Sequence, residues 1–296
     1  MTDPLQRAAN MRGIVALLCG QALFVGSDSV IKLAGEIMPA TEIMAVRGMI
    51  AVAIMGIYVA ATIDRGRWPL LSRPLVLARA ALEALLAVLF LVALPHMALA
   101  DITVTQQIVP LVLTVLSAIV LRESVGWHRW LAVAIGFAGV AMVLQPTGQG
   151  INIYAICALF CAIFVAFRDL ITRRLHDAIP TAVVTLGSTV SVCLAGFLGA
   201  PLQNWQPLSL YAASLLAASA ILVSIANMFI VRAFRGVEVS VVVPFRYATV
   251  VWATLLGFFI WGQVPNTLAM VGTVIIVASG LYTMHREAMR PSSRPA

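Results

Sequence analysis

The sequence predicts an all-α polytopic membrane protein, with ten transmembrane helices arranged as two inverted five-helix repeats and with both termini in the cytoplasm. Three observations support this fold class: the composition, the length of the apolar runs and the distribution of arginine. Of the 296 residues, 61% are hydrophobic and only 10% are charged. Because charged residues make up about a quarter of an ordinary soluble domain, the composition indicates that most of the chain lies in lipid.

Ten apolar runs are long enough to cross a bilayer, since a helix needs roughly 20 residues to span about 30 Å of hydrocarbon. The runs lack the alternation of a transmembrane β-barrel, so helices must satisfy the backbone groups in lipid. The first run has a basic flank but no evident cleavage site, which favours a retained span over a signal peptide. The predicted spans are residues 12–34, 41–62, 74–94, 97–120, 127–145, 151–172, 180–200, 209–233, 237–261 and 265–285.

Arginine marks one side of the membrane. The net charge of +7 could suggest a nucleic-acid partner, but the basic residues gather on alternate connections, and the remaining connections hold only Lys32. Cytoplasmic loops are enriched in Lys and Arg, so we expect cytoplasmic termini and no nucleic-acid partner. A multi-pass location in a bacterial-type inner membrane follows, as a monomer or loose homodimer. The arginines on the cytoplasmic side are 7, 12, 65, 67, 73, 122, 129, 173, 174, 232, 235, 286, 290 and 294.

An internal repeat appears when the chain is shifted against itself by about 140 residues, which aligns Gln107 with Tyr247 and Glu123 with Gln263. Each half holds five spans. Because five is odd, the second half must enter the membrane in the opposite orientation. Inverted repeats are typical of secondary transporters, whose substrate site lies near the midplane. The predicted divisions are a first repeat over residues 1–146, a second, inverted repeat over 147–286, and a disordered cytoplasmic tail over 287–296.

Polar residues lie near mid-depth in two of the predicted spans. Gln107 and Tyr247 are each about ten residues into a span, or about 15 Å deep at 1.5 Å per residue. Neighbouring polar residues recur at spacings of three and four, which places each set on one helix face. Such faces either line a cavity or supply interhelical hydrogen bonds. The candidate substrate-binding residues are Gln21, Phe24, Thr103, Gln106, Gln107, Thr114, Ser224, Asn227, Ser240, Arg246, Tyr247 and Trp252.

Embedded charges and prolines are the candidates for gating and coupling, because an intramembrane charge is functional by default. Arg246 could bind a substrate carboxylate, or instead a carboxylate or carbonyls of the protein. Glu83 follows Arg79 by four residues, which allows an ion pair as well as a proton-coupling role. Asp28 could pair with Lys32, and Arg47 could close onto Asp28 or Asp101. The gating and coupling candidates are Asp28, Arg47, Glu83, Asp101, Pro110 and Pro244, the prolines because they favour kinks.

Enzymatic chemistry has no support in the sequence. We find no P-loop, no metal-ligand spacing among His and acidic residues, and no nucleophile–base constellation. We therefore expect neither a metal nor another cofactor, and no catalytic residue. A receptor would not need two polar stripes in an inverted repeat.

Motifs spread over nearly the whole chain carry a family resemblance. They are "SDSVIKL", "HMALADITV", "LRESVGWHRWLAVAIGFAGVAMVLQP", "VPFRYATVVWATLLGFFIWGQVP" and "GTVIIVASGLYTMHRE". With these motifs the chain resembles the drug/metabolite transporter superfamily, specifically its EamA-type ten-helix exporters. Gln263 departs from the glutamate usual in that second-half pattern. Gln21 stands in the first span, where the small multidrug members of the superfamily use a glutamate.

The resemblance implies export of small metabolites, and similar members move amino acids, nucleotide-linked metabolites, S-adenosylmethionine and cationic drugs. The residues add a donor for a carboxylate, acceptors for an ammonium group and an apolar wall. We therefore expect an exporter of amino acids, hydrophobic or aromatic, or of related small zwitterionic or amphipathic metabolites. Alternating access would occur through a central cavity between the repeats. The alternative is a transporter of S-adenosylmethionine or of drugs and cationic metabolites.

Overall fold

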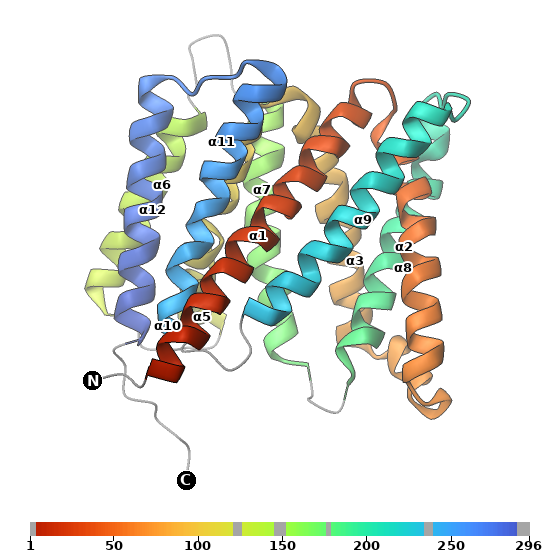
Figure 1. Ribbon diagram of the computed structural model, residues 1–296, viewed down its shortest axis with the longest axis horizontal. Coiled ribbons are helices and arrows are strands. Elements are labelled where there is room, and N and C mark those ends of the chain that lie inside the picture. The colour runs from red at the N-terminus through yellow and green to blue at the C-terminus, as the bar shows by residue number, and fades with distance from the viewer. Residues whose placement is uncertain (1–3, 121–125, 145–151, 176–178, 234–238, 289–296) are drawn as a thin grey trace. The chain divides into compact units, whose positions relative to one another are not determined.

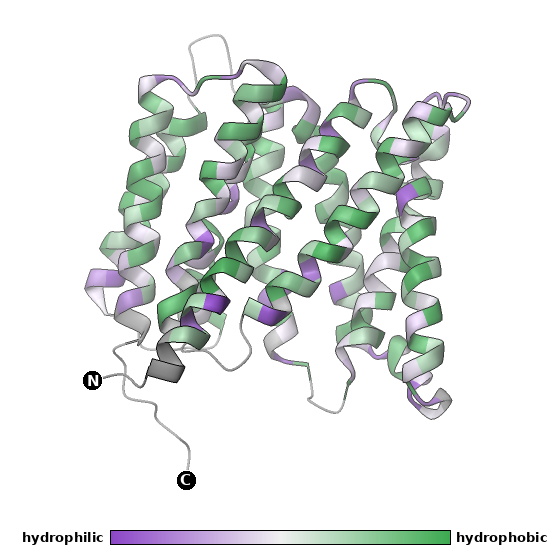
Figure 2. Cartoon of the chain, viewed as in Figure 1, coloured by the Kyte–Doolittle hydropathy of each residue, from purple (hydrophilic) through white to green (hydrophobic). Residues whose placement is uncertain are grey.

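The computed structural model describes residues 4–120, 126–144, 152–175, 179–233 and 239–288. Every element assigned in these ranges is an α-helix or a 3₁₀-helix, which confirms the all-α class (Figure 1). Figure 2 shows hydrophobic residues along most of each long helix. The chain divides into two compact units: unit 1 comprises Met1–Val25, Leu99–Gly150 and Ser224–Ala296, and unit 2 comprises Gly26–Ala98 and Ile151–Val223. Each unit therefore takes segments from both predicted repeats.

Two helices cross the division between the units, and the others belong to one unit each. The crossing helices are α1 (Pro4–Gly35) and α9 (Leu210–Ala233). Unit 1 also contains α4 (Leu99–Gln106), α5 (Val109–Val120), α6 (Trp127–Leu144), α10 (Val239–Val242), η4 (Val243–Tyr247), α11 (Ala248–Trp261) and α12 (Thr267–Ala288). Unit 2 also contains α2 (Ala40–Thr62), η1 (Arg65–Ser72), α3 (Pro74–Ala93), η2 (Leu94–His96), α7 (Ile153–Arg173), α8 (Thr181–Gly199) and η3 (Ala200–Leu202).

Nine of the ten predicted spans appear, within the described residues, as helical stretches long and apolar enough to cross a membrane. The exception is the run over 237–261, which is divided into α10, η4 and α11. The number of ten spans and the cytoplasmic position of the termini therefore stay predictions. The last helix ends at Ala288, and the rest of the tail expected to be disordered lies outside the described residues.

Residues with special backbone preferences set several helix ends. Pro39 and Pro180 are extended N-cap residues of α2 and α8, where proline does not disturb the helix that follows. The Asn152 side chain accepts a hydrogen bond from the Tyr154 amide and so caps α7. Gly262 ends α11 with a φ of 66°, a left-handed conformation that glycine adopts without steric cost.

Unit 1 is held together by close contacts between helices of the two repeats. α6 packs against α12, and α4 packs against α11. At the first contact a Cβ atom on Gly139 would lie 2.9 Å from the Gly272 carbonyl oxygen, so only glycine permits this approach. Leu17, Ala233 and Val242 form a buried cluster of α1, α9 and α10. Small residues at such crossings let membrane helices pack by van der Waals contact.

Unit 2 repeats this arrangement with other helices. α2 packs against α8, and α3 packs against α7 and α8. A Cβ atom on Gly48 would lie 2.8 Å from the Cys193 backbone, so the α2–α8 crossing also depends on a glycine. α2 and α8 correspond to the second and seventh predicted spans, and α6 and α12 to the fifth and tenth. In both units a helix of the first half thus packs against its counterpart from the second half.

Candidate functional site

The fourth predicted span is broken near its middle. α4 ends at Gln106 and α5 begins at Val109, with Gln107 and Ile108 in a turn between them. In this turn the Gln107 backbone N–H donates to the Val104 carbonyl oxygen at 2.9 Å. The acceptor is three residues earlier in the chain, whereas in an α-helix it is four residues earlier. Pro110 has no amide hydrogen to donate to the Gln106 carbonyl. The proline and the turn together interrupt the helix beside the two glutamines.

The ninth predicted span is interrupted at the corresponding place. The 3₁₀-helix η4 has the sequence VPFRY, with Pro244 in its first turn and Tyr247 as its last residue. Gln107 and Tyr247 are the residues that the internal repeat aligns, so both breaks occur at equivalent positions. Both also belong to unit 1. Interrupted helices at equivalent positions of the two halves are the feature with which secondary transporters build their substrate sites.

Gln21 connects α1 to the second of these breaks. Its side chain is only 5% exposed, and Nε2 donates a hydrogen bond of 3.0 Å to the Arg246 carbonyl oxygen. The other amide atom, Oε1, is buried and has no hydrogen-bond partner. Because a carbonyl can only accept, this bond fixes which end of the amide is satisfied. Gln21 therefore keeps one unused acceptor in unit 1.

Among the described residues of unit 1, four further side chains have a buried polar atom without a partner: Gln106 at Nε2, Arg129 at Nη2, Tyr247 at its hydroxyl and Trp252 at Nε1. The Tyr247 side chain is 6% exposed, and its hydroxyl lies in the space that a Cβ atom on Gly280 of α12 would occupy. Buried polar groups are nearly always hydrogen-bonded to protein or water. Gln106 and Tyr247 belong to the two breaks, so their unpartnered groups are available there to a polar ligand or to water.

The other candidate substrate-binding residues differ in exposure and in their contacts. Thr103 and Thr114 donate to the carbonyls of Leu99 and Pro110, so their hydroxyl hydrogens are used within the same helix. The Arg246 side chain is exposed, and only its carbonyl accepts the bond from Gln21. Phe24 and Gln107 are half-buried, Ser224 and Asn227 lie exposed on α9, and Ser240 is part of α10.

The charged residues of the second half of α1 lie in unit 2. Asp28 interacts electrostatically with Arg47 on α2, one of the two partners predicted for this arginine. Lys32 is 2% exposed, and its ammonium donates to the carbonyls of Leu94 at 2.7 Å, Pro95 at 3.2 Å and Met97 at 2.6 Å. These carbonyls end α3 and η2, so a buried cation stabilises a helix C-terminus, where positive charge is favourable.

Glu83 takes part in a wider network than its spacing from Arg79 predicted. The Arg79–Glu83 ion pair is present, with a distance of 3.8 Å between Nη1 and Oε2. Arg168 of α7 also contacts Glu83, at 3.3 Å, and its own neighbour Asp169 at 2.7 Å. Arg79 donates in addition to the hydroxyls of Thr172 and Ser188. Arg168 was not among the residues predicted from the sequence, although an Arg–Asp pair inside an apolar span was a signal for it.

The start of α4 is connected to the end of α11 within unit 1. The Gln263 side-chain oxygen accepts a hydrogen bond of 3.2 Å from the Leu99 amide. The residue that departs from the family's glutamate thus still supplies an acceptor at a helix N-terminus. Asp101 lies in the first turn of α4, where a carboxylate is favourable. It belongs to a different unit from Arg47, so their pairing stays a prediction.

Metal binding has no site in the part of the chain that the structure describes. There, no three side chains of His, Cys, Asp and Glu come together in a way that could hold an ion.

Comparison with known proteins places this arrangement among transporters. An S-adenosylmethionine uptake transporter of Rickettsia prowazekii is 26% identical over 203 residues, which cover 65% of each chain. The pseudopaline exporter CntI of Pseudomonas aeruginosa is 26% identical over 275 residues, 90% of this chain and 94% of that one. A riboflavin transporter of Vibrio cholerae is 30% identical over 187 residues, 61% of each chain. The match thus spans only about two thirds of the Rickettsia protein.

A solved crystal structure has the same fold, with a TM-score of 0.61 at 18% identity, over 96% of this chain and 100% of that chain. The EamA-like transporter family matches the chain twice, over residues 11–145 and 152–284. These two matches include most of both halves. The chain therefore belongs to the EamA-like transporter family.

Proposed function

We propose that the protein exports amino acids, hydrophobic or aromatic, or closely related metabolites by alternating access, with its substrate path at the broken helices of unit 1. The observation that carries this proposal is the set of buried, unpartnered polar atoms. Gln21 offers an acceptor, whereas Gln106, Tyr247 and Trp252 offer donors. An amino acid brings an ammonium group, which donates, and a carboxylate, which accepts. The acceptor and these three neutral donors match both needs, and the buried Arg129 guanidinium of α6 adds a charged donor to unit 1.

The apolar part of the substrate needs a wall of matching chemistry. Phe24 and Trp252 are half-buried aromatic residues of unit 1 and suit this role. Arg246 remains a candidate for attracting the carboxylate, because its exposed guanidinium is attached to η4. In this proposal the chain spans a bacterial inner membrane ten times, and Pro110 and Pro244 favour movement at the two breaks.

Transport of S-adenosylmethionine is a second candidate. The Rickettsia relative carries that name, and S-adenosylmethionine contains the same α-amino acid group beside a purine ring. The donors and acceptor of unit 1 would therefore serve both substrates. The relatives are named for both uptake and export, so the direction is part of the proposal.

Reconstituted vesicles test the proposal directly. Purified protein is incorporated into liposomes loaded with a labelled panel of leucine, phenylalanine, tryptophan, lysine and S-adenosylmethionine. We expect saturable efflux of the neutral amino acids, with little efflux of lysine, because no carboxylate is among the five unpartnered groups of unit 1. Efflux of S-adenosylmethionine alone would favour the second candidate. Equal rates with and without protein for the whole panel would reject both.

A further inference from the structure

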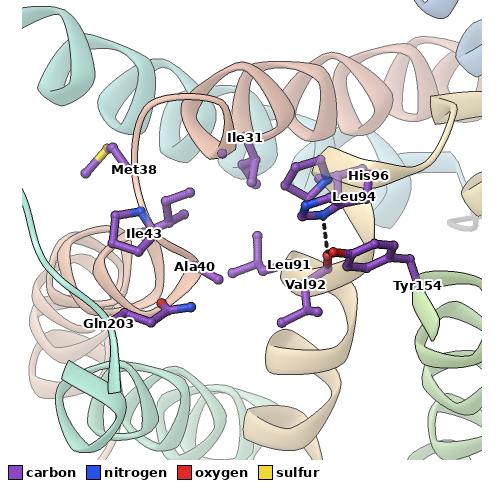
Figure 3. Close-up of a pocket in the computed structure, with 13 residues that line it drawn as sticks. Ile31, Met38, Ala40, Ile43, Leu91, Val92, Leu94, His96, Tyr154 and Gln203 are labelled. Carbon is purple, nitrogen blue, oxygen red and sulfur yellow. Dashed lines mark hydrogen bonds between the residues drawn. The ribbon is translucent and has the colours of Figure 1, made fainter. Parts of the chain in front are cut away.

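A cavity of about 260 Å³ lies in unit 2, where α1, α2, α3 and α7 end or begin (Figure 3). Its walls are largely aliphatic and include Ile31, Ile43 and Leu91. Polar side chains stand at its edges: His96 and Tyr154 on one side, and Gln203 on another. The volume lies just below the range of about 300–1,000 Å³ that is usual for drug-sized ligands. The cavity therefore has room for one ring system.

The two rings at one edge are stacked on each other. The centroids of His96 and Tyr154 are 3.9 Å apart, and the ring planes differ by only 2°. Figure 3 shows them side by side at the margin of the cavity. His96 is exposed, so the pair is accessible. Planar aromatic surfaces of this kind bind other planar rings by stacking, irrespective of the exact ring.

The hydrogen bonds of His96 and Gln203 fix what each side chain offers to a ligand. Nδ1 of His96 lies 3.1 Å from the Val92 carbonyl oxygen, so this nitrogen carries the hydrogen. Nε2 of the neutral imidazole is then an acceptor. The Gln203 oxygen accepts from the Thr41 amide at 3.0 Å and from the Thr41 hydroxyl at 2.8 Å. The Gln203 amide nitrogen is the remaining donor, and in Figure 3 it faces the cavity.

A second bond holds Thr41 in position. The Trp205 indole nitrogen donates to the Thr41 hydroxyl at 2.9 Å, so Trp205, Thr41 and Gln203 form a chain that orients the amide. An aliphatic ligand would fill the walls but would use neither this donor nor the stacked rings. A ring that carries both hydrogen-bond donors and acceptors would use all three features.

We infer that this cavity is a binding site for a planar heteroaromatic ring of nucleobase size, which lies along the His96–Tyr154 pair and accepts a hydrogen bond from Gln203. The site belongs to unit 2 and includes none of the unpartnered polar groups of unit 1. Its role in transport rests on the proposed function, since it would select amino acid derivatives that carry such a ring. Its binding property does not depend on that function.

Adenosine and methionine are suitable probes, with binding to the full-length protein in nanodiscs measured by calorimetry. We expect adenosine alone to bind, without the methionine part of S-adenosylmethionine. His96→Ala should weaken adenosine binding roughly tenfold or more, since stacking on one aromatic ring contributes on that order. His96→Phe keeps a ring and should lose less. Gln203→Glu keeps an acceptor for Thr41 but lacks the donor, so it should weaken adenosine binding while the melting temperature stays unchanged.

Two results would overturn the inference: adenosine that does not bind the wild-type protein, or adenosine that binds His96→Ala and wild type equally. Amino acid transport in vesicles separates this outcome from failure of the proposed function. Transport of leucine without adenosine binding rejects the cavity as a ring site and leaves the unit 1 site standing. Adenosine binding without transport of any amino acid rejects the proposed function and leaves the cavity standing as a ring site.

Discussion

Gln21 and Arg246 are joined by a hydrogen bond of 3.0 Å, in which the Gln21 side-chain nitrogen donates to the Arg246 carbonyl oxygen. The two residues are 225 positions apart, and the bond connects the first helix to the 3₁₀-helix that interrupts the ninth predicted span. It also leaves the Gln21 oxygen buried without a partner. One amide therefore both supports the break in the helix and presents an acceptor.

Replacing Gln21 with leucine removes both roles. We expect transport per folded molecule to fall about tenfold, because one hydrogen bond to a charged group contributes roughly 1.5–3 kcal/mol. Stability should fall only slightly, since an interhelical hydrogen bond in a membrane contributes about 0.6 kcal/mol on average. Cys19→Leu changes an exposed position two residues earlier on the same helix and serves as the control. A large loss of melting temperature with unchanged transport would make Gln21 structural.

Tyr247→Phe removes a hydroxyl that is buried without a hydrogen bond. Because an unsatisfied buried group costs about 1–3 kcal/mol, the variant should be at least as stable as the wild type in thermal unfolding. Transport of neutral amino acids should nevertheless fall several-fold. Tyr58→Phe, at an exposed tyrosine of α2, should change neither quantity. A less stable Tyr247→Phe protein would show that the hydroxyl has a structural partner.

Glu83→Gln leaves Arg79 and Arg168 without the carboxylate that lies between them. The groups are partly exposed, so we expect a loss of about 1–2 kcal/mol, below the cost for a fully buried pair. The double variant with Arg168→Gln should lose less than the sum of the two single variants, because the Glu83–Arg168 pair can be lost only once. Thermal unfolding of the four proteins measures the coupling. Normal stability combined with a lost pH dependence of transport would instead assign Glu83 to proton coupling.

Gly139→Ala places a methyl group against the Gly272 carbonyl at the α6–α12 crossing. We expect a loss of about 1–3 kcal/mol, as for other overpacked contacts. Gly56→Ala is a matched control, because its added methyl group would meet no atom within 4 Å apart from its chain neighbours and the nearby backbone of its own helix. Thermal unfolding compares the two variants. Equal stability would mean that the helices shift apart without cost.

Local sequence patterns predicted the helices and favoured kinks at the two prolines, but they did not predict that two of the spans are interrupted. An apolar run of about 20 residues satisfies its backbone in lipid most simply as a helix, and Pro110 and Pro244 lie beside the interruptions that the structure describes. The helix-internal bonds of Thr103 and Thr114 also follow a local rule, since threonine readily bonds the carbonyl four residues earlier.

Contacts between helices far apart in the chain could not be predicted from the sequence. Nothing in the sequence pattern of α1 indicates that Gln21 donates to the Arg246 carbonyl or that Lys32 donates to the Leu94 carbonyl at the end of α3. Each bond depends on how helices far apart in the sequence pack. The sequence likewise does not show why residue 280 is glycine. The structure does, because the Tyr247 side chain occupies the space of a Cβ atom on Gly280. The internal repeat predicted equivalent positions, but not that each compact unit takes helices from both halves.

The inverted repeat makes a prediction about topology. Reporter fusions after Gly148 and at the C-terminus should be found on opposite sides of the membrane, because five spans separate the two points. A fusion after Arg67 should share the side of the C-terminus and serves as the control. Reporters at Gly148 and the C-terminus on one side would contradict the inverted orientation.

The proposed substrate path is tested most sharply by comparing transport with stability in Gln107→Leu and Tyr247→Leu, the equivalent residues at the two breaks. Initial efflux of a neutral amino acid is measured in vesicles and divided by the amount of folded protein. We predict a strong loss of efflux in both variants with the folded protein still abundant, because the residues serve the substrate path. Unchanged efflux per folded molecule, together with a lower melting temperature, would contradict the claim that the broken helices form that path.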